Sequence, residues 1–181
     1  VTNGMGNTGI YSFAANVNTI FAGSGVPGNA VYKSTNNGTN WTQTSLNNQN
    51  IYSLAVNGND IFAGTNINGV YKSTDNGTTW TQTSFNNQNV RSMAVNGNYI
   101  FVGSGNSPGT GVYKSTDNGT SWIQTTLNNL PVLSLAVNGS NVFAGPFGNT
   151  PSGVYLSTNN GTSWTQTSLN NVDVYSLTVN G

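Results

Sequence analysis

Ser73-Thr74-Asp75-Asn76-Gly77-Thr78-Thr79-Trp80 is a stretch whose skeleton, Ser-x-Asp/Asn-x-Gly-x-x-Trp, occurs four times in the chain. The other copies are residues 34–41, 115–122 and 157–164. A short Asp or Asn side chain accepts hydrogen bonds from backbone N–H groups of its own turn, and glycine supplies a positive φ. The Trp then begins the next strand and buries part of its ring. Each copy is therefore predicted to close a β-hairpin.

A second repeated stretch places these hairpins in a longer unit. Apolar segments such as 51–56, Ile-Tyr-Ser-Leu-Ala-Val, begin at residues 10, 51, 90, 132 and 174, so successive copies are 41, 39, 42 and 42 residues apart. This period lies in the range of four-stranded propeller blades. We expect four strands per repeat, called A to D in chain order, which in the second repeat cover 51–56, 61–64, 70–74 and 79–83. Asn57-Gly58 is predicted as the A–B turn, with positive φ at both residues.

The predicted fold is all-β, a β-propeller-type array of four-stranded antiparallel blades. The chain is expected to form a single repeat domain, 1–181, with blades at approximately 10–50, 51–89, 90–131 and 132–173. Residues 1–9 are expected to end a preceding blade, and residues 174–181 to supply the first strand of a following one. Further blades or a neighbouring chain would then complete the array. A closed four-bladed ring and a segment of a larger ring, of about six to eight blades, are the alternatives.

The composition restricts the chemistry that the chain can perform. Only 4% of the 181 residues are charged, with four Lys or Arg balancing four Asp, and the chain contains no Glu, His or Cys. This balance lacks the basic footprint of a nucleic-acid-binding protein, and no apolar run is long enough to cross a membrane. Nucleic-acid binding and membrane insertion are therefore not expected. A polar, uncharged surface rich in Asn, Thr and Ser favours an extracellular or cell-surface location.

The four-copy motif resembles the Asp-box, or bacterial neuraminidase repeat, of sialidases, sortilin-type receptors, photosystem II assembly factors and secreted bacterial proteins. The resemblance covers nearly the whole chain and implies β-propeller blades with the motif at each C–D turn. It also implies a structural role for the Ser, Asp or Asn, Gly and Trp of every copy: Ser34, Asn36, Gly38, Trp41, Ser73, Asp75, Gly77, Trp80, Ser115, Asp117, Gly119, Trp122, Ser157, Asn159, Gly161 and Trp164. Because Asn replaces Asp in two copies, a metal role is not expected.

The length differences between repeats arise in one loop. The segment between strands B and C spans seven residues in 24–30, five in 65–69, and eight in both 104–111 and 146–153. Insertions confined to one loop lie on one face of a repeat array, often its binding face. That face holds the candidate ligand contacts, which are Pro27, Asn29, Asn66, Ile67, Arg91, Asn106, Pro108, Phe147 and Pro151, with Tyr11, Tyr52 and Tyr175 at the starts of A strands. Packing between blades is the alternative role of these tyrosines.

Three functions follow from these observations. Sialidases use an arginine cluster and acidic helpers, whereas this chain has one arginine, so we predict no enzyme, catalytic residue, metal site or cofactor. The favoured function is a non-enzymatic structural or assembly module of a surface protein, adhesin or filament, with self-association or other repeats of the same protein as partners. A glycan- or protein-binding propeller using the B–C loops is the alternative. A non-catalytic part of a sialidase-like glycosidase is a more remote one.

Overall fold

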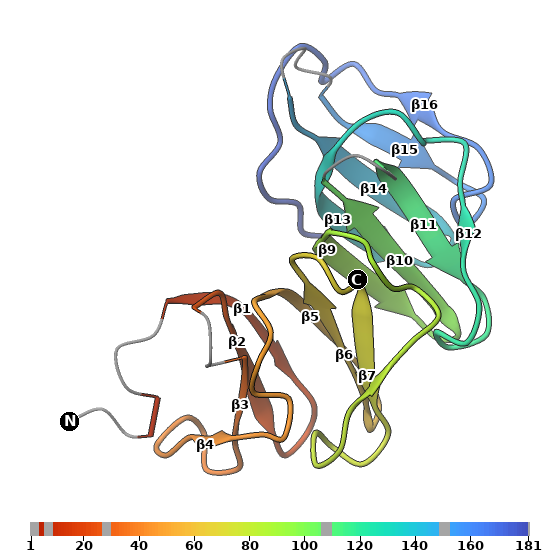
Figure 1. The fold of residues 1–181 in the computed structure, drawn as a ribbon. Helices are drawn as coiled ribbons and strands as arrows, with labels where there is room; N and C mark the ends of the chain where they lie inside the picture. Colours follow the sequence, from red (N-terminus) through yellow and green to blue (C-terminus); the bar gives the residue numbers. More distant parts are fainter. Residues whose placement is uncertain (1–3, 6–8, 27–29, 106–109, 149–152, 181) are drawn as a thin grey trace. The chain divides into compact units, whose positions relative to one another are not determined.

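The computed structural model describes residues 4–5, 9–26, 30–105, 110–148 and 153–180. These residues form sixteen strands in four separate four-stranded antiparallel sheets. No described residue is helical, so the described chain offers no helix that could cross a membrane. The prediction of an all-β chain with four antiparallel four-stranded sheets is confirmed (Figure 1).

Each sheet contains four strands that are consecutive in the sequence. Sheet 1 consists of β1 (Ile10–Ala15), β2 (Ile20–Ser24), β3 (Val31–Ser34) and β4 (Thr42–Gln43). Sheet 2 consists of β5 (Ile51–Asn57), β6 (Asp60–Thr65), β7 (Val70–Ser73) and β8 (Thr81–Gln82). Sheet 3 consists of β9 (Val90–Asn96), β10 (Tyr99–Ser104), β11 (Gly111–Ser115) and β12 (Ile123–Gln124). Sheet 4 consists of β13 (Val132–Asn138), β14 (Asn141–Pro146), β15 (Tyr155–Ser157) and β16 (Thr165–Gln166).

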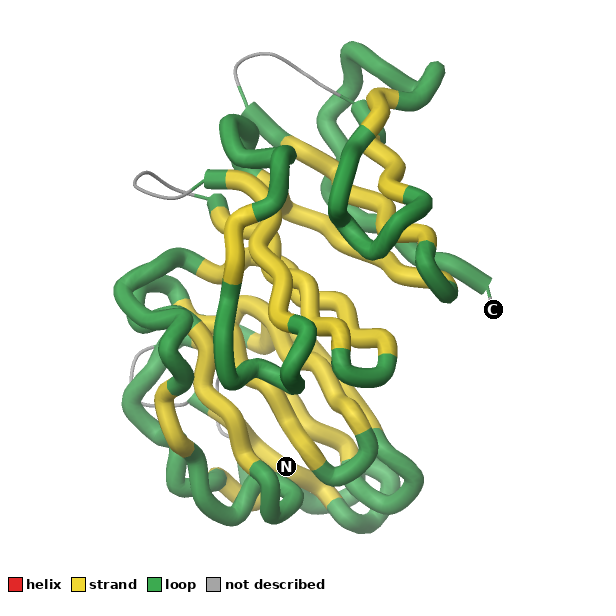
Figure 2. The backbone as a smooth tube through the Cα atoms, turned by 90° about the vertical axis from the view of Figure 1, so that its right-hand side faces the viewer, coloured by secondary structure: helices red, strands yellow, loops and turns green. Residues whose placement is uncertain are grey.

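The chain divides into two compact units. The first spans Val1–Asn87 and contains sheets 1 and 2, and the second spans Gln88–Gly181 and contains sheets 3 and 4. In every sheet the strands lie side by side in sequence order, so that the chain meanders from strand A to strand D (Figure 2). The A–B and C–D connections therefore lie at one end of each sheet, called here the turn end. The B–C loops and the segments that follow strand D lie at the other, called the loop end.

A β-bulge interrupts the A–B pairing near the start of every A strand. In sheet 2, Ile51 pairs with Thr65 and Ser53 with Gly64, so that Tyr52 is the extra residue. The same shift occurs between Ile10 and Ser12, between residues 90 and 92, and between residues 132 and 134. A bulge re-aims the side chain of its extra residue and increases the local twist. The sequence did not predict this bulge, because the spacing of the repeats is the same whether or not one residue of strand A is left unpaired.

The hydrophobic core lies between sheets within each unit. Phe21, Leu46, Ile51 and Leu54 belong to one buried cluster that joins sheets 1 and 2. Phe101, Leu127, Val132 and Leu135 form the corresponding cluster between sheets 3 and 4. Fully burying a side chain of this size contributes about 1.5–3 kcal/mol. The D strands β4, β8, β12 and β16 are only two residues long and exposed, so they contribute little to this core.

A glycine in strand B allows the next sheet to approach closely. A Cβ added at Gly23 would lie 2.6 Å from Cγ2 of Ile51, the first residue of sheet 2. A Cβ added at Gly103 would lie 2.9 Å from Cγ1 of Val132, the first residue of sheet 4. Only a residue without a side chain leaves room for this packing. At these two positions the strand B glycine is therefore a contact between repeats.

The A–B turn differs from the prediction in its geometry. In sheet 2 Asn57 pairs with Asp60, so that Gly58 and Asn59 are the central residues of the turn. Gly58 has a φ of 63°, and Asn59 has no positive φ. This is the pattern of a type II′ turn, which needs positive φ at its first central position alone. The prediction that both Asn57 and Gly58 have positive φ was therefore wrong.

Residues 174–179, expected as an A strand, have no strand assignment, because no second strand pairs with them. Their position still follows that of an A strand. A Cβ added at Gly145 of sheet 4 would lie 2.6 Å from Cγ1 of Val174, as Gly23 approaches Ile51. The Ser134 hydroxyl also donates to the Val174 carbonyl at 3.0 Å. Val174 thus docks on sheet 4 as the first residue of a next repeat docks on the sheet before it.

Candidate binding surfaces and the repeated turn

The Asp75 turn is held together by side-chain hydrogen bonds. The buried Ser73 hydroxyl accepts from the Gly77 N–H at 2.8 Å and donates to Asp75 Oδ1 at 2.8 Å. Asp75 Oδ1 also accepts from the backbone N–H groups of Thr78, at 3.0 Å, and Thr79, at 2.8 Å. The predicted roles of Ser, Asp and Gly are thus visible as one local network.

The other three copies have the same geometry. Their Gly N–H groups donate to Ser34, Ser115 and Ser157 at 2.8–2.9 Å. Asn159 Oδ1 accepts from Thr162 N–H at 3.1 Å and Ser163 N–H at 2.9 Å, so that an amide makes the bonds of a carboxylate. The N–H and hydroxyl donors lower the pKa of Asp75 to about 2, with the Thr79 N–H and hydroxyl as the largest causes. Donors from Ser121 lower the pKa of Asp117 to about 2.

The second and fourth turns also contact the sheet before them, one in each unit. A Cβ added at Gly77 would lie 2.7 Å from the ring of Phe21 in sheet 1, and one at Gly161 would lie 3.0 Å from Phe101 in sheet 3. The Lys33 ammonium donates to the Asn76 carbonyl at 3.4 Å. Its counterpart Lys114 donates to the Asn160 carbonyl at 3.1 Å. The turn therefore couples repeats, whereas sequence reasoning described a self-contained hairpin clip.

The four tryptophans that follow the turns are half-buried. Trp41 and Trp122 donate to the carbonyls of Gly38 and Gly119 in their own turns. Trp164 instead donates to the Thr125 hydroxyl in the preceding repeat, at 3.2 Å. Trp80 packs against the core cluster that joins sheets 1 and 2. Two of the rings thus stabilise their own turns, and the other two stabilise a junction between repeats.

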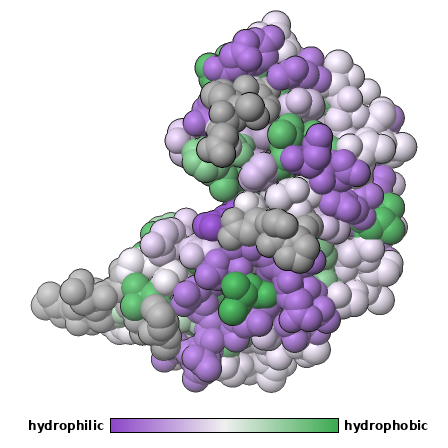
Figure 3. Space-filling model, turned by 45° about the horizontal axis from the view of Figure 1, so that its top comes forward, coloured by the Kyte–Doolittle hydropathy of each residue, from purple (hydrophilic) through white to green (hydrophobic). Residues whose placement is uncertain are grey.

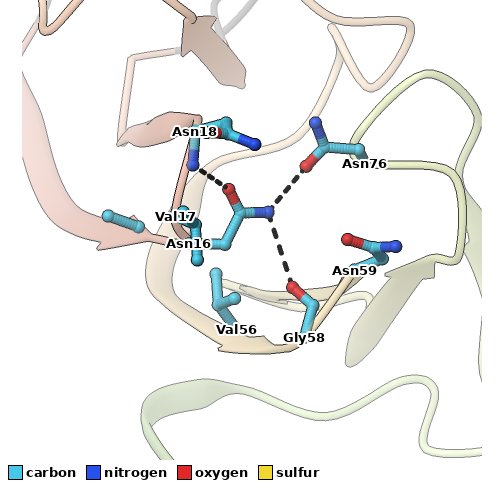
Figure 4. Close-up of a pocket in the computed structure, with 8 residues that line it drawn as sticks. Asn16, Val17, Asn18, Val56, Gly58, Asn59 and Asn76 are labelled. Carbon is cyan, nitrogen blue, oxygen red and sulfur yellow. Dashed lines mark hydrogen bonds between the residues drawn. The ribbon is translucent and has the colours of Figure 1, made fainter.

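A pocket of about 580 Å³ opens at the turn end between sheets 1 and 2 (Figure 4). The Asn16 amide lies at its centre and donates to Asn76 Oδ1 at 2.8 Å and to the Gly58 carbonyl at 3.4 Å. Asn76 Nδ2 donates in turn to the Thr19 hydroxyl at 3.0 Å. These amides connect the first A–B turn with the two turns of sheet 2. Sequence reasoning missed this pocket because no motif marks it.

At the loop end, Asn66 and Ile67 line a groove of about 180 Å³ together with Asn48, Gln49, Asn50 and Asn68. The Asn68 amide donates to Gln49 Oε1 at 2.7 Å, and the Asn66 N–H donates to the Asn50 carbonyl at 3.1 Å. Ile67 is 65% exposed at the tip of the B–C loop. The structure thus brings two of the predicted ligand contacts into one uncharged, amide-lined groove.

The bulge residues lie at the same end and reach their own B–C loops or the next repeat. A Cβ added at Gly105 would lie 2.6 Å from Cγ of Arg91. The Tyr11 and Tyr52 rings meet edge to face with their centroids 5.5 Å apart, as expected for packing between repeats. Tyr11 nevertheless remains 63% exposed. Five of the predicted ligand contacts, namely Pro27, Asn29, Asn106, Pro108 and Pro151, lie outside the described residues.

Phe147 and Tyr175 form a further aromatic pair at the loop end of sheet 4, with centroids 5.6 Å apart. They are 38% and 67% exposed. Space-filling representation of one face shows mostly hydrophilic and intermediate residues with separate hydrophobic patches (Figure 3). The exposed apolar groups are therefore local features of a polar surface.

The described residues contain no group of three Asp, Glu, His or Cys side chains that could hold a metal ion. Three of the four acidic side chains are instead bound separately, in two turns and one ion pair. Asp75 and Asp117 accept the turn N–H groups, and Asp60 forms an ion pair with Lys72 at 3.0 Å. Asp173 lies near the loop end, just before Val174, with one buried carboxylate oxygen that has no hydrogen-bond partner.

Compared by sequence, the chain matches no protein-family model and no curated protein. Compared by structure, it is similar to an ancestral GH74 enzyme, with 27% identity, a TM-score of 0.72, and coverage of 90% of this chain and 24% of that one. A Niastella koreensis GH74 enzyme shows 26% identity, a TM-score of 0.67, and coverage of 87% and 28%. YCF48 bound to a D1 peptide shows 15% identity, a TM-score of 0.67, and coverage of 87% and 52%.

The chain spans between about a quarter and a half of the length of these three proteins. These proteins include enzymes and a peptide-bound protein. The similarity therefore establishes the architecture, and the activity has to be inferred from the residues of this chain. The four sheets, their meandering order and these similarities together identify the chain as a β-propeller-type repeat protein.

Proposed function

We propose that this chain is a non-catalytic structural repeat module that assembles by stacking further repeats of the same kind on its two end faces. The observation that carries the proposal is the docking of Val174 on Gly145, which repeats the docking of Ile51 on Gly23 and of Val132 on Gly103. Because the same contact occurs at three junctions, it supports a structure built by stacking one repeat on the next. Its extracellular or cell-surface location is part of the same proposal.

Exposure of equivalent residues identifies the two end faces. Leu46 and Leu127 follow the D strands of repeats one and three and are 7% and 4% exposed, because a sheet of the same unit covers them. Leu169, in the same position of repeat four, is 55% exposed. At the other face, Leu54 of strand A is 8% exposed, whereas its counterpart Phe13 in repeat one is 61% exposed.

The partner that fits these faces is another repeat. Leu169 is the counterpart of Leu46, which is buried at the junction between sheets 1 and 2. Phe13 is the counterpart of Leu54, which belongs to the same buried cluster as Leu46. Each face is complementary to the other and not to itself, so contact between copies is head-to-tail. We therefore expect a second copy of this chain to be a partner that the faces can accept.

Self-association of the 181-residue chain tests this proposal. Sedimentation velocity over a wide concentration range should show reversible association that Leu169→Ser weakens. Ile123→Ser is the matched control, since Ile123 is 57% exposed on the outer strand β12 of the same unit. A chain that stays monomeric at every concentration, or an equal loss in both variants, contradicts the assembly function.

No catalytic residue is proposed, and three features support this. The chain has no His, Cys or Glu. Two of its four aspartates are bound up in turns and a third in an ion pair. Glycoside hydrolysis needs a pair of carboxyl groups, or in sialidases a Tyr nucleophile with acidic helpers, and three of the four aspartates serve other bonds.

A second candidate function is the binding of a glycan or peptide at the loop end. The amide-lined groove between 48–50 and 66–68 favours it, because amides offer both donors and acceptors to an uncharged ligand. Glycan and peptide arrays probed with the whole chain test this candidate, with Ile67→Ser as the variant expected to lose the signal. Array binding that survives this change would place the ligand elsewhere.

A further inference from the structure

Sheet 4 contains two Asn-Gly pairs in turns of different structure. Asn138-Gly139 joins strands β13 and β14, and Asn160-Gly161 lies in the turn between β15 and β16. In an Asn-Gly pair the glycine nitrogen can attack the asparagine side-chain carbonyl carbon. A new C–N bond forms, ammonia leaves, and a five-membered succinimide results. Water then opens this ring to aspartate or isoaspartate, without any oxidant or reductant.

The attacking nitrogen is held away at Gly161. Its N–H donates to the Ser157 hydroxyl at 2.8 Å, and Gly161 itself is buried. Ring closure would require this hydrogen bond to break and the nitrogen to turn towards the Asn160 side chain. The same bond occurs at Gly38, Gly77 and Gly119, so every C–D turn protects its Asn-Gly pair.

The Gly139 nitrogen has no such restraint. Among the described residues no group accepts a hydrogen bond from it, and both Asn138 and Gly139 are exposed. No atom lies within 4 Å of the position of a Cβ on Gly139, so the backbone there has room to move. The first requirement for ring closure, a free and accessible nitrogen, is met.

The side chain of Asn138 is also unrestrained. Its counterparts Asn16 and Asn96 donate to the carbonyls of Gly58 and Gly139, in the following repeat, at 3.4 and 2.7 Å. No described residue accepts a hydrogen bond from the Asn138 amide. The hydrogen bond that restrains the Asn16 and Asn96 side chains is therefore absent at Asn138.

From these contacts we propose that Asn138 is a site of spontaneous deamidation, and that the Asn-Gly pairs of the four C–D turns are protected from it. Conversion adds one negative charge to a chain whose formal net charge is zero. It also replaces the amide donor that Asn16 and Asn96 use between repeats with a carboxylate, which cannot donate to a carbonyl. The modification would thus weaken the stacking of a further repeat on sheet 4.

The test uses the folded 181-residue chain, incubated in mildly alkaline buffer and followed by peptide mapping with mass spectrometry. Asn138 is expected to convert faster than Asn160 by up to about tenfold, the factor given by the net free energy of one hydrogen bond. Asn96, whose amide is engaged, should fall between them. In urea the two pairs should convert at similar rates. Equal rates at Asn138 and Asn160 in the folded chain would overturn the proposal.

Two variants separate the restraint from other causes. Ser157→Ala frees the Gly161 nitrogen and should raise conversion at Asn160 while leaving Asn138 unchanged. Asn138→Gln lengthens the side chain, which slows ring closure, and should reduce the earliest-forming acidic species seen by ion-exchange chromatography. Should Ser157→Ala unfold the chain, Asn138→Gln remains decisive, because acidic species that form at the same rate in this variant contradict the assignment.

Discussion

The turn end and the loop end of the sheets have opposite characters. At the turn end, four copies of one hydrogen-bond network recur, and two of them dock on the preceding sheet through Phe21 and Phe101. At the loop end, the B–C loops vary from five to eight residues, and Ile67 and Phe147 are exposed while Arg91 is half-buried. The turns, which contact a neighbouring sheet, are thus alike in all four repeats, whereas the B–C loops, which carry exposed side chains, differ in length.

This difference separates two uses of the same polar residues. At the turn end, Asn and Ser side chains satisfy buried backbone N–H groups, and losing such a partner costs about 1–3 kcal/mol. At the loop end, amides such as Asn68 and Gln49 bond to each other at the surface, where the net contribution is smaller. Changes at the two ends should therefore differ in their effect on stability.

The largest effect is expected at Gly77. Gly77→Ala combines a φ of 76° with a Cβ 2.7 Å from the Phe21 ring, and should lower the free energy of unfolding by about 2–4 kcal/mol. Gly58→Ala is the control, because its φ is 63° but no atom lies within 4 Å, and should cost about 1 kcal/mol. Urea unfolding followed by tryptophan fluorescence measures both. Equal losses would show that the turn does not depend on the preceding sheet.

A smaller effect is expected from pH. The pKa values of Asp75 and Asp117 lie at about 2 in the folded chain, below the ordinary 3.8, so these groups add stability above pH 3.8 that is lost as the pH falls towards 2. Asp75→Asn combined with Asp117→Asn should flatten this loss, as Asn already serves in copies one and four. Thermal unfolding across this pH window distinguishes the variants, and an unchanged acid dependence would assign it to other groups.

The smallest effect is expected at the loop end. Asn68→Ala removes a half-buried amide hydrogen bond with Gln49 and should lower the free energy of unfolding by about 0.5–1 kcal/mol. The same urea titration provides the measurement. A loss as large as that of Gly77→Ala would mean that this loop is part of the core structure, which would remove the contrast between the two ends.

Much of the fold was predictable because its signals are local. Repeat spacing gave four sheets, and the second repeat was expected at 51–56, 61–64, 70–74 and 79–83, close to the observed β5 to β8. The Ser, Asp and Gly roles in the turn follow from short-range bonding and were anticipated. The A–B turn was misread because the pairing partner of Asn57, which decides the turn type, depends on the register with β6.

The candidate sites were less predictable. Asn66 and Ile67 were expected on a variable face, but the groove also needs Asn48, Gln49 and Asn68, from a segment after strand D and the same loop. The bulges at Tyr52 and Arg91 could not be predicted from the sequence. An extra residue on one strand changes which residues pair across the sheet but not the repeating pattern of residue types. The pocket around Asn16 joins residues up to 60 positions apart and carries no motif.

By itself, the sequence determined the strand order, the position of each turn and the lack of charge, because all three depend on neighbouring residues or on composition. The tertiary structure alone decided that Gly77 and Gly161 dock on phenylalanines of another sheet, that Val174 takes the place of a next repeat, and which Asn-Gly nitrogens are free. These properties depend on which surfaces come into contact. Repeats with the same motif therefore differ in them because their neighbours in the fold differ.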